Sequence, residues 1–267
     1  PIFLAYRARD EINWLVELVM KNGDRIYHFT TDDGVGHRVW RIDDEKMIQN
    51  FVDAFSRVPY TYIADGHHRA ESAVRVGELR RKQHPGYTGE EPFNYFLSVL
   101  FPGDQLMIMP YNRVVQDLNG LTEEAFLAAA SEHFRVSPAA DPVKPERKGV
   151  VGLYLPGRWY RMEAKEEILS DDPVAGLDVS ILQDRLLGPV LGIQDPKTDR
   201  RIRFVGGIRG VHELERRVGQ GMAAAFSMYP TSMEELFRVS DAGLLMPPKS
   251  TWFEPKLRSG IFIHRLS

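Results

Sequence analysis

Five consecutive residues at positions 65–69, Asp-Gly-His-His-Arg, combine side chains that could bind an anion and move a proton. They follow an apolar, strand-like run at residues 60–64 and precede a helical pattern of small and apolar residues. A glycine in such a turn lets the backbone approach a ligand closely, and the first N–H groups of a helix point outward without intrahelical acceptors. The pattern therefore predicts a phosphate-binding turn with a carboxylate beside it.

A purely structural interpretation of this run is also open. Asp-Gly is a common turn dipeptide, and an aspartate just before a helix often only caps it. Solvated histidines on a loop are ordinary. The position of the run between a buried strand and a helix favours the functional interpretation, and neither is excluded by the sequence.

Composition places the chain among ordinary globular proteins. The 267 residues are 43% hydrophobic and 27% charged, which allows one large or two modest domains. The net charge of −3 gives no pull toward nucleic acid, and no apolar run is long enough to span a bilayer. The chain has no cysteine, so disulfides, thiolate metal sites and a cysteine nucleophile are excluded, which fits a cytoplasmic protein.

Strand-like and helical patterns alternate along the chain, and hairpins are frequent, so we expect a mixed α/β or α+β fold with helices flanking a mixed sheet. Residue 1 is a proline that leads directly into an apolar run, which predicts that the sequence begins inside a fold. We expect an incomplete nucleotide-binding part at residues 1–115, an α+β insertion at 116–170, and an α/β part at 171–267 that completes the sheet. The last strand is expected at 261–264.

Two further segments carry candidate ligand-binding side chains. Asn112 and Arg113 follow an expected strand that ends at Met109, where polar residues suit either a site or a surface turn. A stiff, proline-bounded loop presents cations and hydroxyls beside aromatic rings, which suits a phosphate or carboxylate group. Its candidates are Lys249, Ser250, Thr251 and Lys256. A structural loop that covers a sheet edge is the alternative.

Metal-binding patterns in the chain are sparse. Adjacent histidines usually point apart and no His-x-x-x-His pair is present, so we expect no zinc and no haem. Magnesium held jointly by Asp65 and nucleotide phosphates fits better, since Mg²⁺ commonly uses one or two carboxylates together with phosphate oxygens. Asp32 and Asp33 could offer oxygen ligands for a cation, but turn chemistry explains both residues without a metal.

Three blocks together resemble an uncharacterised bacterial and archaeal family, domain of unknown function 1015. They read YIADGHHR at 62–69, DGVGHRVW at 33–40 and MPPKSTWFEPK at 246–256. The Asp-Gly-His-His-Arg block is also similar to the phosphate-binding element of the ParB/sulfiredoxin-like fold. It most resembles that of the free serine kinases, which phosphorylate L-serine with ADP or ATP. The glutamate that those kinases carry near the N-terminus has no matching residue here.

The resemblance implies a nucleotide-dependent kinase for a small hydroxylated metabolite, with L-serine as the first candidate. It implies Asp65 and His67 as catalytic residues, Asp65 as the Mg²⁺ ligand, and a phosphate-binding set of Gly66, His67, His68 and Arg69. The alternative is a ParB-like nucleotide-sensing module without kinase turnover. The expected partners are a nucleotide and a small substrate, with neither a membrane nor nucleic acid, and a homodimer is left open.

Overall fold

The computed structural model describes residues 1–258 and 260–265 and shows a mixed α/β protein, as the alternating pattern predicts. The chain divides into two compact units. The first contains Pro1–Leu106 and Leu257–Ser267, and the second contains Met107–Lys256. In the described part of the chain, no helix is both long and apolar enough to cross a membrane.

The first unit is built on a three-stranded sheet of order β4-β1-β5, in which β1 runs antiparallel to β4 and parallel to β5. Its strands are β1 (Ile2–Tyr6), β4 (Tyr62–Asp65) and β5 (Ser98–Pro102), and a separate hairpin pairs β2 (Arg25–Thr30) with β3 (Gly36–Trp40). Every residue of β1 is buried, as expected for a central strand with both faces covered.

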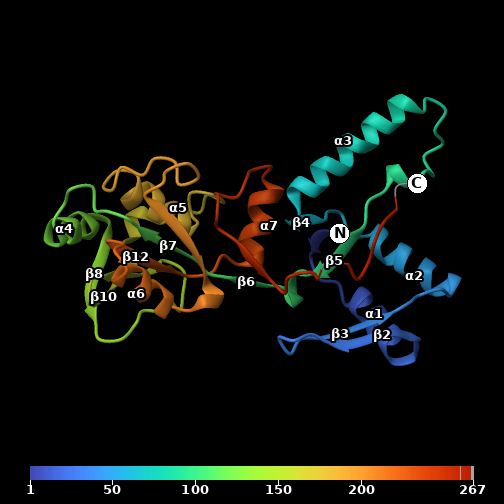
Figure 1. Ribbon diagram of the computed structural model, residues 1–267, viewed down its shortest axis with the longest axis horizontal. Helices are drawn as coiled ribbons and strands as arrows, with labels where there is room; N and C mark the ends of the chain where they lie inside the picture. Colours follow the sequence, from blue (N-terminus) through green and yellow to red (C-terminus); the bar gives the residue numbers. More distant parts are fainter. Residues whose placement is uncertain (259, 266–267) are drawn as a thin grey trace. The chain divides into compact units, whose positions relative to one another are not determined.

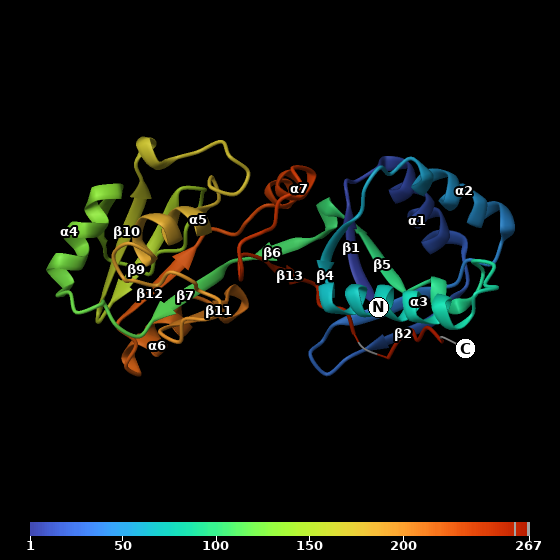
Figure 2. The ribbon, with the colours of Figure 1, turned by 90° about the horizontal axis from the view of Figure 1, so that it is seen from above.

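Helices cover both faces of this sheet. They are α1 (Asp10–Asn22), α2 (Glu45–Ser56) and α3 (His67–Gln83). Figures 1 and 2 show α1 and α2 on one side of the sheet and α3 on the other. The side of α1 and α2 is held by a small apolar core that contains Tyr6, Ile12, Leu15 and Ala54. On the other side, α3 begins directly after β4, so the first unit places the start of α3 at the end of a strand.

The second unit is built on a six-stranded antiparallel sheet of order β11-β7-β12-β9-β10-β8. In chain order its strands are β7 (Tyr111–Val115), β8 (Phe134–Ala139), β9 (Val150–Leu155), β10 (Arg158–Ala164), β11 (Ile202–Gly206) and β12 (Ala224–Met228). A two-stranded ribbon joins β6 (Met107–Met109) to β13 (Trp252–Glu254).

Each face of this larger sheet has its own apolar core. The larger core includes residues of α4 (Glu123–His133) and α5 (Asp178–Leu182), among them Phe126, Ala130 and Leu182. The smaller core packs α6 (His212–Gly219) against β7, β9 and β12. A last helix, α7 (Met233–Asp241), completes the unit.

Two sequence expectations about strands are corrected by the structure. Residues 261–264 form no strand; the last strand of the described chain is β13, which has a hydrogen-bonding partner in β6. Asn112 and Arg113 do follow a strand that ends at Met109, β6, but they lie in neither a loop nor a surface turn: they are inside the next strand, β7, between β11 and β12. Both differences have one cause. An apolar run becomes a strand only where a neighbouring strand forms hydrogen bonds with its backbone, and a segment with polar residues becomes a strand where such a neighbour is present.

Gly206 ends β11 and Gly207 begins the short helix that follows, a position where glycines can form either a phosphate loop or a tight turn. A Cβ at Gly206 would lie 2.7 Å from the Trp252 ring, and a Cβ at Gly207 would lie 2.6 Å from Pro110. Both positions therefore need glycine for close packing, which supports the tight turn.

Candidate functional site

The turn between β4 and α3 has the backbone geometry that the sequence predicts for an anion-binding element. Gly66 has φ 97° and ψ 27°, a left-handed conformation that residues with a Cβ rarely adopt. Gly66 has no side chain to cap the helix, and the first backbone bond of the turn runs from Ala70 N to Gly66 O at 2.9 Å. The amides that open α3 therefore point away from the helix, where an oxyanion can accept from them.

Arg69 and Asp65 flank this turn. The Arg69 Nη2 atom lies 3.9 Å from Asp65 Oδ2, and both side chains are about half exposed. A Cβ at Gly66 would lie 2.8 Å from Arg69 Nη2 and 2.9 Å from Nε. The guanidinium therefore lies across the glycine, and position 66 needs glycine both for its φ angle and for the approach of Arg69.

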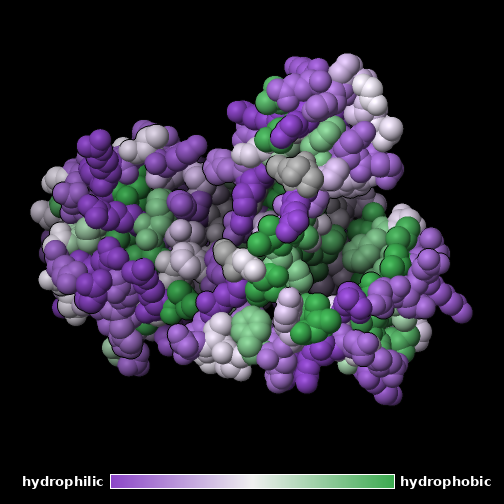
Figure 3. Space-filling view, turned by 45° about the vertical axis from the view of Figure 1, so that its right-hand side comes forward, coloured by the Kyte–Doolittle hydropathy of each residue, from purple (hydrophilic) through white to green (hydrophobic). Residues whose placement is uncertain are grey.

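The two histidines face solvent at the start of α3. The His68 side chain is fully exposed, and its Nδ1 lies 4.0 Å from Glu71 Oε2. His67 is also exposed. Further along the helix, Arg75 pairs with Glu71 at 2.6 Å, and Figure 3 shows a largely hydrophilic surface over α3. Within residues 1–258 and 260–265, no three histidine or acidic side chains gather into a metal-binding group.

An apolar pocket of about 360 Å³ adjoins Arg69 along one face of α3. It is lined by Arg69, Ala73, Val76, Phe93 and Phe96, together with His264 among others. The His264 Nε2 atom lies 3.0 Å from Pro92 O, so the C-terminal segment of the first unit helps to close the pocket. Ligand sites are typically apolar pockets of this size with a few polar groups.

These pocket residues were not predicted from the sequence. A signal was present, because three aromatic residues occur within residues 93–96. Their contact with α3 depends on how the segment after the helix folds back, and this could not be inferred from the spacing alone. The short helix at Pro92–Asn94 places Phe93 against α3.

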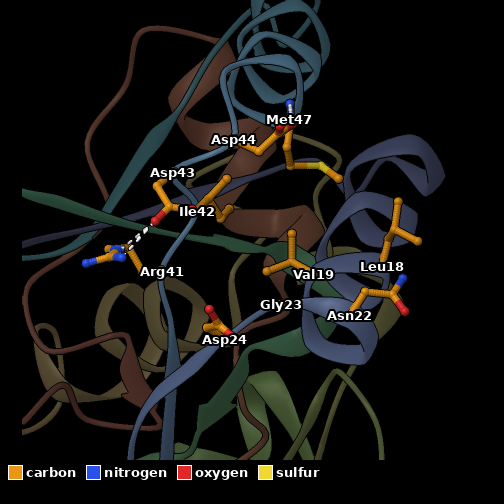
Figure 4. Close-up of a pocket in the computed structure, with 10 residues that line it drawn as sticks. All are labelled: Leu18, Val19, Asn22, Gly23, Asp24, Arg41, Ile42, Asp43, Asp44 and Met47. Carbon is orange, nitrogen blue, oxygen red and sulfur yellow. Dashed lines mark hydrogen bonds and ion pairs between the residues drawn. The ribbon is translucent and has the colours of Figure 1, made fainter.

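A second pocket of the first unit, about 370 Å³, lies beside α1 and the start of α2 (Figure 4). Its apolar side chains include Leu18, Val19, Ile42 and Met47. Its carboxylates have structural roles: Asp43 pairs with Arg41 at 2.7 Å, and Asp44 caps α2 by accepting from Met47 N at 2.7 Å. No residue of the Asp-Gly-His-His-Arg run lines this pocket.

The remaining candidates belong to the second unit, whereas residues 65–69 belong to the first. Asn112 is buried and accepts a hydrogen bond from Met228 N at 3.0 Å. Ser250 is buried and donates to Pro247 O at 2.7 Å. These two side chains stabilise the sheet and the loop, respectively. Thr251 is half-buried, and Lys256 Nζ lies 5.4 Å from the centre of the Trp252 ring.

The hairpin aspartate considered as a cation ligand, Asp33, has a turn role. It accepts from Thr31 Oγ1 at 2.6 Å and from Val35 N at 3.3 Å, and it pairs with Arg258. The hydrogen bonds from Thr31 and Val35 hold the pKa of Asp33 below its usual value. Turn chemistry, as the sequence indicates, accounts for this residue.

A family described as "Protein of unknown function (DUF1015)" matches residues 1–180. The match includes the blocks at 33–40 and 62–69, and the block at 246–256 lies outside it. No curated protein matches the sequence.

Several solved structures are distantly similar to the chain. A free serine kinase in complex with AMP has 14% identity and a TM-score of 0.40, and the similarity covers 94% of this chain and 83% of the kinase. A mutant free serine kinase in complex with ADP has 16% identity and a TM-score of 0.38 over the same shares. SbnI from Staphylococcus aureus, truncated at its C-terminus, has 10% identity and a TM-score of 0.40, covering 98% of this chain and 82% of SbnI. Similarity at this level does not establish an activity.

Proposed function

Because the chain belongs to the DUF1015 family, whose function is unknown, we propose an activity from its own residues. It is a nucleotide-dependent phosphotransferase that acts on a small hydroxylated metabolite, with free L-serine as the first candidate. The observation that carries this proposal is the turn at residues 65–69. There a carboxylate, a left-handed glycine, the open end of a 17-residue helix and a guanidinium occupy consecutive positions.

Phosphoryl transfer depends on charge neutralisation and positioning more than on covalent catalysis by the protein. The opening amides of α3 would hold nucleotide phosphate oxygens. Arg69 now pairs with Asp65 at 3.9 Å. When a nucleotide binds, the guanidinium would move from this carboxylate to a phosphate oxygen, because a charge-assisted hydrogen bond to phosphate is stronger than a half-exposed ion pair. His67, exposed at the start of α3, would add a further donor to the transferred group.

Asp65 would then serve the acceptor hydroxyl, orienting it and taking its proton as the phosphoryl group arrives. One half-exposed carboxylate beside a phosphate site also fits Mg²⁺, which commonly uses one or two carboxylates together with phosphate oxygens. When bound there, Mg²⁺ would neutralise charge on the nucleotide.

The apolar pocket beside Arg69 supports a nucleotide in particular as the ligand. Its volume of about 360 Å³ and its aromatic residues Phe93 and Phe96 suit a planar base. Arg69 lines both the pocket and the turn, so a base in the pocket would place its phosphates toward the start of α3.

The direct test is turnover. The protein is incubated with Mg²⁺, ADP or ATP and a panel of amino acids that includes L-serine, and phosphorylated products are identified by mass spectrometry. Asp65→Asn and Arg69→Met are each expected to reduce turnover by about 100-fold or more. Arg75→Met is the matched control, because Arg75 lies on the same helix but pairs with Glu71. Equal turnover in Asp65→Asn and Arg75→Met would refute the role of Asp65.

The second candidate is a nucleotide-sensing module without turnover. The same turn supports it, because the open amides of α3 and Arg69 can bind nucleotide phosphates whether or not Asp65 then takes a proton. In that case nucleotide binding would remain sensitive to Arg69→Met, while no phosphorylated metabolite would form with any acceptor.

A further inference from the structure

Arg113 is a buried cation in the second unit. Its side chain lies on β7 with only 4% of the residue exposed. A guanidinium has five N–H donors. One Nη1 group donates to Tyr111 O, and Nη2 donates to Lys249 O at 3.4 Å. Among residues 1–258 and 260–265, no carboxylate forms an ion pair with Arg113, although buried charges are normally paired.

A second cation, Lys249, lies close to the first. Its carbonyl accepts from Arg113, and its Nζ lies 6.0 Å from the centre of the Tyr111 ring. Phe204, the cross-strand partner of Arg113, has the guanidinium 5.7 Å from its ring centre. The rings of Tyr111 and Phe204 meet edge to face at 5.8 Å. Aromatic faces therefore hold two neighbouring cations, which raises the local positive potential without neutralising it.

The backbone at Lys249 is also unusual. Its φ is 57°, in the left-handed region that residues with a side chain seldom occupy. Such conformations persist only where surrounding contacts enforce them, and here the bond from Arg113 to the Lys249 carbonyl is one such contact. The conformation fixes the direction in which this lysine leaves the loop.

A pocket of about 470 Å³ opens beside Lys249 and Phe204, and Arg113 contacts both of these residues but is not part of the pocket lining. Its walls include Phe204 and Lys249, with a second lysine, Lys197, and the apolar Ile202 and Met246. The one carboxylate of its lining, Asp199, is already neutralised, because its Oδ2 lies 2.8 Å from Arg201 Nη2. The pocket therefore combines apolar and aromatic walls with positive charge that has no counter-ion in its lining.

We propose that this pocket of the second unit is a binding site for a small oxyanion attached to an apolar or aromatic body, with Lys249 and Lys197 of the lining contacting the oxyanion and the buried Arg113 adding positive potential from outside the lining. The oxyanion is a phosphate or a carboxylate, since the ammonium groups of the two lysines can donate charge-assisted hydrogen bonds to either. The body packs on Phe204 and Met246. This site shares no residue with the turn at 65–69 and does not depend on the proposed phosphotransferase activity.

The protonation of Arg113 fits an anion site. Burial lowers the pKa of Arg113 to about 10, which leaves the guanidinium charged at neutral pH. An oxyanion nearby would favour the charged form and return the pKa toward its usual value. The alternative role for Arg113 is purely structural: it holds the Lys249 loop and needs no ligand. The experiment distinguishes this structural role from a role in anion binding.

Binding is measured by calorimetry with four probes: phenyl phosphate, benzoate, inorganic phosphate and benzyl alcohol, the last being a neutral ring control. The reference protein carries Arg69→Met, so that anions at the start of α3 do not contribute. Adding Lys249→Met is expected to weaken phenyl phosphate or benzoate binding about tenfold. The matched control adds Arg203→Met, which removes a positive charge from the exposed, opposite face of β11 and is expected to change the dissociation constant less than about twofold.

The tighter of phenyl phosphate and benzoate identifies the oxyanion. Arg113→Met gives a second readout that does not require full stability: the thermal midpoint of the reference protein should rise with the tighter probe, and that of Arg113→Met should not. Three results would overturn the proposal. They are the absence of binding by both anionic probes at millimolar concentration, equal binding by benzyl alcohol, and equal dissociation constants for Lys249→Met and Arg203→Met.

Discussion

Gly66→Ala tests the turn at its most constrained backbone position. Gly66 is left-handed, with φ 97°, and an added Cβ would lie 2.8 Å from the Arg69 guanidinium. Alanine must therefore either strain the backbone or displace Arg69, and we expect both. Because Arg69 is the proposed phosphate ligand, the substitution should affect nucleotide binding as well as stability.

The size of each effect follows from the contacts. Alanine in the left-handed region costs about 1–2 kcal/mol, and part of this is offset because alanine restricts the unfolded chain. Loss of the half-exposed Arg69–Asp65 pair adds up to about 1 kcal/mol. The free energy of unfolding of the first unit should fall by about 1–2 kcal/mol. Displacing one charge-assisted contact should weaken ADP binding by roughly 10- to 100-fold.

Gly34→Ala is the matched control for this substitution. Gly34 is also left-handed, with φ 80°, and an added Cβ has no heavy atom within 4 Å. It therefore carries the backbone strain without the contact to Arg69. Amide hydrogen exchange gives the local stability, measured on peptides from β4 and α3 for Gly66→Ala and from β2 and β3 for Gly34→Ala, and calorimetry gives the affinity for ADP.

The two variants should differ in which property they lose. Both should lose stability, and only Gly66→Ala should lose affinity. If Gly66→Ala binds ADP as tightly as the natural protein while its stability falls as in Gly34→Ala, the guanidinium over the glycine has no part in binding. The proposed anion site at the start of α3 would then be wrong.

Three predictions concern the second unit. Burial raises the pKa of Asp178 to about 6, so the folded state binds more protons than the unfolded state between about pH 4 and pH 6, and stability falls as pH rises through this window. Asn at position 178 can still accept from Gly149 N. Asp178→Asn should therefore be roughly 2 kcal/mol more stable than the natural protein above pH 6 and equally stable near pH 4. Urea unfolding measures this, and a stability difference that does not change with pH would contradict the prediction. Ser232→Ala removes a capping box and should cost about 1 kcal/mol, with faster amide exchange confined to α7. Trp159→Phe removes the bond from Nε1 to Glu215 Oε1 at 2.9 Å, which should cost about 1 kcal/mol and raise the Glu215 pKa in an NMR titration.

The elements that could be predicted from the sequence are those fixed by local interactions. The capping box of α7 is one of them, because it needs only a serine and a glutamate three residues apart: Ser232 Oγ accepts from Glu235 N at 3.1 Å, and Ser232 N donates to Glu235 Oε2 at 2.9 Å. The β2–β3 hairpin is confirmed for the same reason, because its turn is closed by Thr31 and Asp33. The helical pattern that follows residues 65–69 is also confirmed, and α3 begins within that run, at His67, because Gly66 separates the strand from the helix by a single residue.

What could not be predicted depends on contacts between distant segments. The sequence Tyr-Asn-Arg at 111–113 does not resemble a buried strand, and it becomes one only because β11 and β12 pair with it on both sides. The strand β13 is short and exists through its pairing with β6, nearly 150 positions earlier in the chain. No period in the sequence encodes either pairing.

The two candidate sites differ in the same way. The turn at residues 65–69 was identified from the sequence because its groups are consecutive, and its geometry follows from one glycine and one helix start. Beside the pocket of the second unit, Lys249 contacts Arg113, which lies 136 positions earlier in the chain, and neither this contact nor the burial of Arg113 can be read from the order of the residues. A polar residue inside a strand conflicts with the hydrophobic pattern, and such conflicts tend to occur at functional sites. The guanidinium on β7 contacts the Lys249 carbonyl and the Phe204 ring, so it links two walls of the pocket to the sheet and brings a buried positive charge close to them.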